Sequence, residues 1–374
     1  MDTAGTTAGV TAGSAAGMPN GRAAARRLAY AVGQTARVGW YFGQYALAAR
    51  LAGPTTRPEE RPSGPYPATA EILGDLRNLM ETDWRNIEAG LYRMPHDLVR
   101  DPRRLLADAA RFFRDLPEVQ RRRRTKANSE VFRAPPPGTE SLPRYYRQNF
   151  HFQTDGYLSD ESARLYDQQV EVLFGGGADA MRRQALVPIA EYLRGRDTRT
   201  LRLLDVATGT GRLPSFVKDN WPRLDVTLLD LSRPYLDRAL AALSRWSRVH
   251  AVQAPAEALP FPDGGFDVVT SVFLLHELPR KVRVQALREM ARVLKPGGLL
   301  VLVDSLQLGD RPRYEGLLRL FPVAFHEPYY GDYIQHDLPG ELAAAGLGPA
   351  EVTLAFMSKV VSARRVEAGG ADLS

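Results

Sequence analysis

Two acidic residues and two glycines stand at a spacing that suits a nucleotide-like ligand. Asp205 ends an apolar run at 201–204, and Gly209 and Gly211 follow it at the fourth and sixth positions. Glycine has no Cβ, so such a turn can adopt positive φ and let a ligand approach the backbone closely. A second apolar run ends at Asp230, whose carboxylate can accept hydrogen bonds from both hydroxyls of a ribose. A glycine turn alone also occurs without any ligand, but the second acid favours a ligand site.

The elements that must hold these residues alternate between strand and helix. A helix should begin near Arg212, and another should end at the Pro-Gly-Gly turn at 296–298. Apolar runs predict strands at about 201–206, 226–230, 266–275 and 299–304, with a further strand ending near 253. Such alternation over roughly 100 residues predicts an α/β fold with a doubly wound, mostly parallel sheet.

These motifs carry a family resemblance. Residues 205–211, Asp-Val-Ala-Thr-Gly-Thr-Gly, resemble class I S-adenosylmethionine-dependent methyltransferases, most closely the ubiquinone/menaquinone C-methyltransferase group, which also has alanine at the third position. The resemblance covers about residues 200–305 and, in looser form, 150–360. It implies a Rossmann-like seven-stranded sheet with helices on both faces. It also implies S-adenosyl-L-methionine as the cofactor and S-adenosyl-L-homocysteine as the product.

The resemblance also implies which residues hold the cofactor. Asp230 would bind the ribose, the two glycines would let the ligand lie against the backbone, and apolar neighbours would contact the adenine and sulfonium. The full implied set is Asp205, Ala207, Thr208, Gly209, Gly211, Asp230, Leu231, Ala256, Glu257 and Phe273. One departure is Pro255, which stands where many relatives place an acid for the adenine amino group. The adenine contact would then come from the Ala256 backbone, from Glu257, or not be made.

Catalytic candidates follow the fourth and fifth strands. The resemblance places His276 near the donor methyl, where an imidazole could remove a proton from the acceptor. The alternative is that His276 only caps the next helix. The second group is His326, Glu327, Tyr329 and Tyr330, in a segment at 309–337 that departs from the strand–helix alternation and would form one wall of a pocket. Its alternative is a polar hinge on a surface loop. No metal site is predicted, because no His/carboxylate pair has a convincing helical ligand spacing.

Composition limits the class of protein. The 374 residues contain no cysteine, which excludes disulfides and thiolate metal sites and fits a cytoplasmic protein. No apolar run reaches 18 residues, so no membrane span is expected. The net charge of +6 is uneven, with +8 over residues 1–150 and −2 over the remainder. Net charge alone is a weak indicator of partners, so nucleic-acid binding is not expected.

The region before the predicted sheet is expected to be a helical accessory region at 22–140, after a disordered tail at 1–21. Helices are predicted at 22–52, 69–94 (stopped by Pro95) and 102–117, with a linker at 53–68. An arginine run at 121–124 is expected to face solvent, and contact with phosphate or nucleic acid is the alternative. The helix at 22–52 interleaves basic and aromatic residues. We expect it to pack on its own domain or on a second copy, and contact with an anionic membrane surface or a partner protein is the alternative.

The predicted methyltransferase domain occupies 141–365. It begins with an aromatic cluster that, with Arg182 or Arg183, would cover the cofactor or instead seal the edge of the sheet. The cluster comprises Tyr145, Tyr146, Phe150, His151, Phe152 and Tyr157. Ser159 should cap a helix. Further helices are expected at 178–193 and 338–347, the last strand at 352–361, and a loose tail at 367–374.

The sequence thus favours an enzyme that methylates carbon or oxygen of a small aromatic or amphiphilic acceptor, such as a quinone, polyketide or lipid-like molecule. The quinone suggestion comes from the resemblance alone. A different class, a non-catalytic scaffold bound to a partner or membrane, is the alternative, and an RNA methyltransferase is less favoured. A homo-oligomer is left open.

Overall fold

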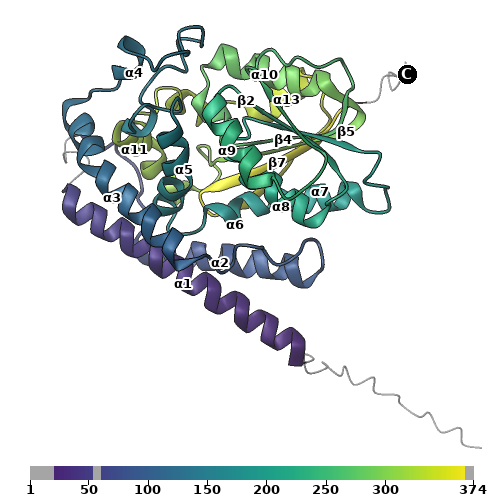
Figure 1. Cartoon of the computed structure of the whole chain (residues 1–374), viewed down its shortest axis with the longest axis horizontal. Coiled ribbons are helices and arrows are strands. Elements are labelled where there is room, and N and C mark those ends of the chain that lie inside the picture. Colours follow the sequence, from purple (N-terminus) through teal and green to yellow (C-terminus); the bar gives the residue numbers. More distant parts are fainter. Residues whose placement is uncertain (1–20, 54–59, 367–374) are drawn as a thin grey trace, which may run out of the picture.

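Five parallel strands and an antiparallel hairpin form one seven-stranded sheet in the order β3-β2-β1-β4-β5-β7-β6 (Figure 1). The computed structural model describes residues 21–53 and 60–366. The strands are β1 Arg202–Val206, β2 Asp225–Asp230, β3 Val249–Gln253, β4 Phe266–Val272, β5 Leu294–Ser305, β6 Glu351–Ala355 and β7 Ser358–Arg364. β7 runs antiparallel to both β5 and β6. The predicted Rossmann-like sheet is confirmed.

The helices precede the sheet and cover it. They are α1 Gly21–Ala52, α2 Thr69–Glu88, α3 Pro102–Thr125, α4 Glu130–Arg133, α5 Asp160–Leu173, α6 Ala178–Arg183, α7 Leu186–Leu193, α8 Arg212–Asn220, α9 Arg233–Leu243, α10 Arg280–Val293, α11 Glu315–Phe325, α12 Tyr330–Tyr333 and α13 Leu338–Ala344. Short 3₁₀ turns are η2 Phe150–Phe152, η3 Leu275–Glu277 and η4 Pro312–Tyr314. The cap at Ser159 is confirmed, since its side chain accepts a hydrogen bond from the Ser162 N–H.

Each face of the sheet buries its own apolar core. Successive side chains of a strand point to opposite faces, so Leu203 packs with α7, α8 and α9, whereas Leu204 packs with α10 and α13. Figure 1 shows these two helical layers on either side of the strands. The core that contains Leu203 also includes Tyr30 of α1 and Trp84 of α2, so these N-terminal helices share a core with the sheet.

Several predicted boundaries are wrong. The helix predicted to reach Pro95 ends at Glu88, where Gly90 turns the chain with a φ of +73°. The helix predicted to end at 117 continues to Thr125, because Arg121 and Arg122 pair with Glu118 one turn earlier.

Two later elements are split. The helix predicted at 178–193 breaks into α6 and α7, since the ring of Pro188 would clash with the carbonyl of residue 184 in a continuous helix. The last predicted strand is a hairpin of β6 and β7, and β5 begins within the segment predicted to end a helix. The segment 309–337 contains η4, α11 and α12.

The N-terminal helices lie against the body of the protein. α1 packs on α2, α3 and α5, and α2 packs on α6, as Figure 1 shows for α1 and α2 along one side. The buried face of α1 includes Tyr30, Gln34, Tyr41 and Gln44, which agrees with packing on its own domain. Leu28, Val32, Leu47 and Leu51 are exposed on the same helix, and membrane contact stays a prediction. Within the described residues, no helix is long and apolar enough to cross a bilayer.

Some predictions concern residues that the structure does not describe. The predicted tail at 1–20, part of the linker at 54–59 and the C-terminal tail at 367–374 lie outside the described residues. Gly21, which the sequence assigned to the tail, is the first residue of α1. The division into an accessory region and a domain from 141 stays a prediction.

Candidate active site

The glycine turn after β1 is shaped by its backbone. Ala207, Gly209 and Gly211 all have positive φ, at +56°, +56° and +80°. The Thr208 N–H donates to the Leu229 carbonyl over 2.9 Å, which ties the turn to the end of β2. A Cβ at Gly211 would lie 2.6 Å from Leu243 Cδ1 of α9. Gly211 therefore serves the close approach of α9, while Gly209 is the glycine that faces the ligand side.

Asp230 is held at the centre of this arrangement. Its carboxylate oxygens accept one hydrogen bond each from the Gly209 and Ser232 N–H groups, both at 2.8 Å. Burial raises the pKa of Asp230 to about 6, although these two hydrogen bonds oppose the shift. Each oxygen keeps a free lone pair, and the side chain lies on the wall of a cavity. The residue can therefore accept two hydroxyl hydrogens from a ligand.

That cavity, the first cavity, contains six of the ten implied cofactor residues. They are Ala207, Gly209, Asp230, Leu231, Ala256 and Phe273. The aromatic residues Tyr145, Tyr146, Phe150 and Tyr157 also line this cavity, whose volume is about 100 Å³. Residues that sequence reasoning did not assign to this site complete it: Tyr166, Leu229, Tyr235, Ala254, Val272, Leu274, Glu277 and Leu278.

The other four implied residues lie off the wall of the first cavity. Asp205 is buried beneath the turn, where it accepts a hydrogen bond of 2.5 Å from the Thr270 hydroxyl, and burial raises its pKa to about 6. Thr208 and Gly211 shape the turn. Glu257 accepts a 2.7 Å hydrogen bond from the Tyr145 hydroxyl and so supports that wall from behind. We assign these residues to the structure of the site.

Two apolar cavities adjoin the first. The central cavity, about 310 Å³, shares Tyr166, Phe273 and Glu277 with the first cavity. The outer cavity, about 240 Å³, shares Tyr45, His151 and six other residues with the central one. Residues of α1 and α2 contribute to the wall of the central cavity, and residues of α1 and α3 contribute to the wall of the outer cavity.

His276 lies on the wall of the central cavity. Its Nδ1 is 2.5 Å from Asp304 Oδ1 at the end of β5, and its Nε2 is 3.8 Å from Glu277 Oε1. Burial alone lowers the pKa of His276, but Asp304 and Glu277 outweigh burial and raise it to about 9. His276 does not cap the next helix, because no side chain caps the N-terminus of α10. The contact with Asp304 fixes the orientation of the His276 ring, and Nε2 is the ring nitrogen that faces away from Asp304.

The four candidates near residue 326 have different positions. Tyr330 lies on the central cavity with its hydroxyl 2.5 Å from Ser305 Oγ. His326 is not on the walls of these three cavities; its Nδ1 pairs with Asn128 at 3.1 Å, and burial lowers its pKa to about 4. Tyr329 is also off the walls and accepts a hydrogen bond from Gln148. Tyr329 directly precedes α12, and its catalytic role stays a prediction. Glu327 is fully buried behind the wall, 2.9 Å from His151.

Sequence reasoning did not assign catalytic roles to His151, Glu277 and Asp304. The only signals were position: Glu277 follows His276 directly, Asp304 ends an apolar strand, and His151 sits among aromatics. Their convergence comes from tertiary packing.

Part of the chain is similar to known methyltransferases. Residues 203–298 match the methyltransferase domain family. The ubiquinone/menaquinone biosynthesis C-methyltransferase UbiE of Methylobacterium nodulans is 37% identical over 145 residues, which are 38% of this chain and 55% of that protein. The demethylmenaquinone methyltransferase of Thermus thermophilus is 38% identical over 148 residues, 39% of this chain and 64% of that protein. The chain carries a class I S-adenosylmethionine-dependent methyltransferase domain.

The similarity covers part of each protein. The chain spans 55% and 64% of the length of these two curated relatives. Among solved structures, the CurJ carbon methyltransferase is 15% identical, with 92% of this chain and 94% of that chain covered and a TM-score of 0.48.

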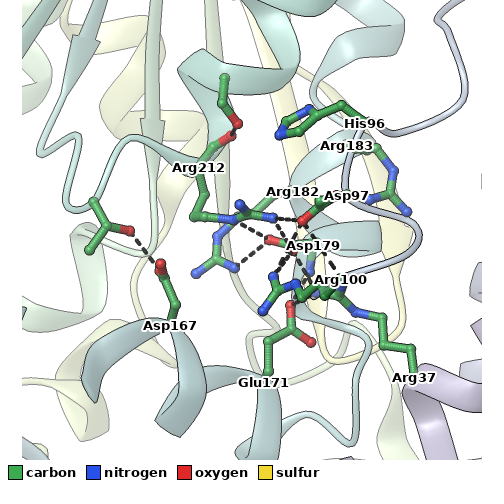
Figure 2. Close-up of polar contacts among 12 residues, drawn as sticks. Arg37, His96, Asp97, Arg100, Asp167, Glu171, Asp179, Arg182, Arg183 and Arg212 are labelled. Atoms are coloured by element: carbon green, nitrogen blue, oxygen red, sulfur yellow. Dashed lines mark hydrogen bonds and ion pairs between the residues drawn. The ribbon is translucent and has the colours of Figure 1, made fainter. Parts of the chain in front are cut away.

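An ion network fastens the methyltransferase domain to the N-terminal helices. Figure 2 shows Arg37, Arg100 and Arg212 converging on Asp179 of α6. Arg212 is the first residue after the glycine turn, and Arg37 belongs to α1. Asp167 of α5 accepts a 2.6 Å hydrogen bond from Thr210 in the same turn. The turn that shapes the first cavity is therefore braced by α1, α5 and α6.

The two arginines proposed as cover residues belong to this buried framework. Arg183 binds Asp83 of α2 over 2.6 Å, and Arg182 pairs with Asp179 at 3.1 Å. Neither lies on the wall of the three cavities. Arg182 does stack over Phe273, with 5.4 Å from its Cζ to the ring centroid. The expectation that Arg182 or Arg183 covers the cofactor is therefore wrong. Both arginines instead form buried ion pairs.

Proposed function

We propose that the protein transfers a methyl group from S-adenosyl-L-methionine to carbon or oxygen of a small amphiphilic acceptor. The observation that carries the proposal is a shared wall. Phe273 and Glu277 border both the cavity that contains Asp230 and the larger apolar central cavity. A cofactor whose ribose is held by Asp230 would therefore meet an acceptor in the central cavity across these two side chains.

The chain would contribute mainly positioning. The sulfonium is intrinsically reactive, so the rate depends on holding donor and acceptor in line and keeping water away. Asp230 would bind the ribose hydroxyls, Gly209 would let the ligand lie on the turn, and the aromatic wall from Tyr145 to Tyr157 would close over it.

The acceptor class follows from the walls. The central and outer cavities are lined mainly by aliphatic and aromatic side chains, while His276, Glu277 and Tyr330 gather polar groups at the central cavity. This distribution suits a molecule with one polar ring or head and an extended apolar part. A quinone-like acceptor fits, and the curated relatives are named for quinone biosynthesis.

His276 would interact with an oxygen of the acceptor. With a pKa of about 9 it is mainly protonated at neutral pH, so its Nε2–H can donate a hydrogen bond to an oxygen that gains negative charge. Once it has lost that proton, the same nitrogen can accept one from an acceptor hydroxyl. Asp304 would act as the positioning residue, because it fixes the orientation of the ring.

The proposal is tested by calorimetric titration of the full chain with S-adenosylmethionine and S-adenosylhomocysteine. We expect saturable one-to-one binding, weakened at least ~10-fold by Asp230→Ala, since two hydrogen bonds to a charged group are lost. Asp237→Ala on α9 is the control, because Asp237 is exposed and pairs with Arg233. If neither ligand binds, the methyltransferase proposal is wrong and the non-catalytic scaffold is favoured.

The acceptor class is tested separately. Purified protein with methyl-labelled S-adenosylmethionine is offered a demethylated naphthoquinol and, in a parallel reaction, transfer RNA. Label in the organic extract supports a small amphiphilic acceptor, and label in the RNA alone contradicts it.

A further inference from the structure

Three ligand-type side chains meet beside the central cavity. His151 of η2, Glu277 of η3 and Glu327 after α11 bring an imidazole nitrogen and two carboxylate oxygens within 4.8 Å of one another. His151 Nε2 lies 2.9 Å from Glu327 Oε1 and 3.5 Å from Glu277 Oε1. A tetrahedral site with bonds of about 2.0–2.2 Å places its ligand atoms about 3.3–3.6 Å apart. The cluster has the size of a metal site.

Each of the two carboxylates keeps one oxygen without a partner in the part of the chain that the structure describes. The Glu327 side chain is fully buried; its Oε1 pairs with His151, whereas its Oε2 has no hydrogen-bond partner among the described residues. Oε2 of Glu277 is also without a hydrogen-bond partner among these residues. Burying an unpartnered carboxylate costs free energy, and a second carboxylate beside it adds repulsion. A cation between the two would remove both costs.

The neighbouring groups would orient such a ligand set. The Tyr157 hydroxyl donates to Glu277 Oε1 over 2.7 Å, which is the kind of hydrogen bond that fixes a metal-binding carboxylate. Phe321 and Phe325 place ring edges against His151, with centroids 6.1 and 6.4 Å away. These contacts leave the three ligand atoms directed at one another.

The cluster is also placed where a ligand could reach it. His151 lies on the walls of the central and outer cavities, and Glu277 lies on those of the first and central cavities. Glu327 stands behind them. An ion held by three protein ligands keeps coordination positions free, as in catalytic metal sites.

We propose that His151, Glu277 and Glu327 bind one divalent metal ion whose open positions face the central cavity. One nitrogen and two oxygen ligands suit Mn²⁺, Fe²⁺ or Zn²⁺ better than a cation that prefers an all-oxygen site. An oxygen of the acceptor would complete the coordination and be held beside the cofactor; this role rests on the proposed function, whereas metal binding does not. This proposal departs from the sequence-based expectation of no metal site.

The first experiment is a titration of chelator-treated full-length protein with Mn²⁺ and, separately, with Zn²⁺. We expect one saturable site in calorimetry and a rise in the unfolding temperature with metal concentration. Glu327→Gln should weaken binding at least ~10-fold. Glu161→Gln, an exposed carboxylate on α5, is the control and should leave metal affinity unchanged.

The outcomes separate this inference from the proposed function. If Glu327→Gln loses the metal but still binds S-adenosylhomocysteine, the site is supported independently of the cofactor. Lack of saturable binding of either metal, or equal affinity in wild type and Glu327→Gln, would overturn it and leave a His–carboxylate pair.

A second measurement needs no variant. Co²⁺ added to the wild-type chain should give the visible absorption bands of a protein-bound, low-coordinate ion, and Zn²⁺ should displace it. A spectrum identical to that of aqueous Co²⁺ would contradict the site even if Glu327→Gln fails to fold.

Discussion

The guanidinium of Arg37 lies 2.6 Å from the carboxylate of Asp179, although the two residues are 142 positions apart in the chain. Asp179 also binds Arg212, which follows the glycine turn. Burial alone would raise the pKa of Asp179, but Arg212 and Arg37 hold it well below its usual range. α1, which contributes to the walls of the central and outer cavities, is therefore coupled to the turn that shapes the first cavity.

This ion pair predicts a large effect of Arg37→Ala. Removing one partner of a buried pair leaves the other charge less compensated, so we expect about 3 kcal/mol loss in the free energy of unfolding. Arg26→Ala, at an exposed position on the same helix, should change it by less than about 0.5 kcal/mol. Chemical denaturation of both variants checks this, and equal midpoints would contradict it.

Cofactor affinity should depend on pH through Asp230. The carboxylate form binds the ribose, and the pKa of about 6 means that protonation competes as the pH falls through that value. We expect affinity for S-adenosylhomocysteine to be constant above about pH 7 and about 10-fold weaker at pH 5. Asp230→Asn should bind weakly with a flat profile, and a wild-type profile that is equally flat would argue against the assignment.

Substituting Gly211 and Gly346 by alanine distinguishes the cost of backbone strain from the cost of steric overlap. Both have left-handed φ, at +80° and +85°, but only a Cβ at Gly211 meets neighbouring atoms. Gly346→Ala should cost about 1–2 kcal/mol. Gly211→Ala should cost about 3 kcal/mol or more, because α9 must also move. Thermal unfolding of the two variants decides whether α9 packing is the reason for this glycine.

The aromatic segment at 145–158 should respond to the cofactor. Its side chains leave about 100 Å³ in the first cavity, less than the roughly 300 Å³ at the lower end of ligand pockets. We therefore expect binding to shift this segment and to order it around the ligand. We expect slower hydrogen–deuterium exchange at 145–158 with S-adenosylhomocysteine and no change in α3. Equal protection throughout the chain would indicate only global stabilisation.

His276→Asn should separate turnover from binding. We expect methyl transfer to fall about 10²–10⁴-fold with unchanged S-adenosylhomocysteine affinity, since His276 lies on the central cavity rather than the first. His250→Asn, at an exposed position on β3, should leave both unchanged. Loss of cofactor affinity in His276→Asn would point to a structural role instead.

The sequence alone determined the centre of the fold. The strand before Asp205, the glycine turn and the strand ending at Asp230 are local patterns, and local patterns survive in any packing of the chain. That is why the sheet and the turn were predictable, whereas the six residues of the first-cavity wall were implied by the family resemblance. The ends of two helices, at Glu88 and Thr125, were harder to predict. A glycine turn ends the first before Pro95, and charge pairs one turn apart extend the second beyond residue 117.

Only the tertiary structure decided the chemistry around the acceptor. His151, Glu277 and Glu327 are separated by 126 and 50 positions, and no spacing rule connects residues on three different elements. The same holds for Arg183, which pairs with Asp83, and for His326, which turns toward Asn128 and away from the cavities. Local sequence sets φ, ψ and periodicity, whereas the direction of a buried side chain depends on which distant segment packs against it.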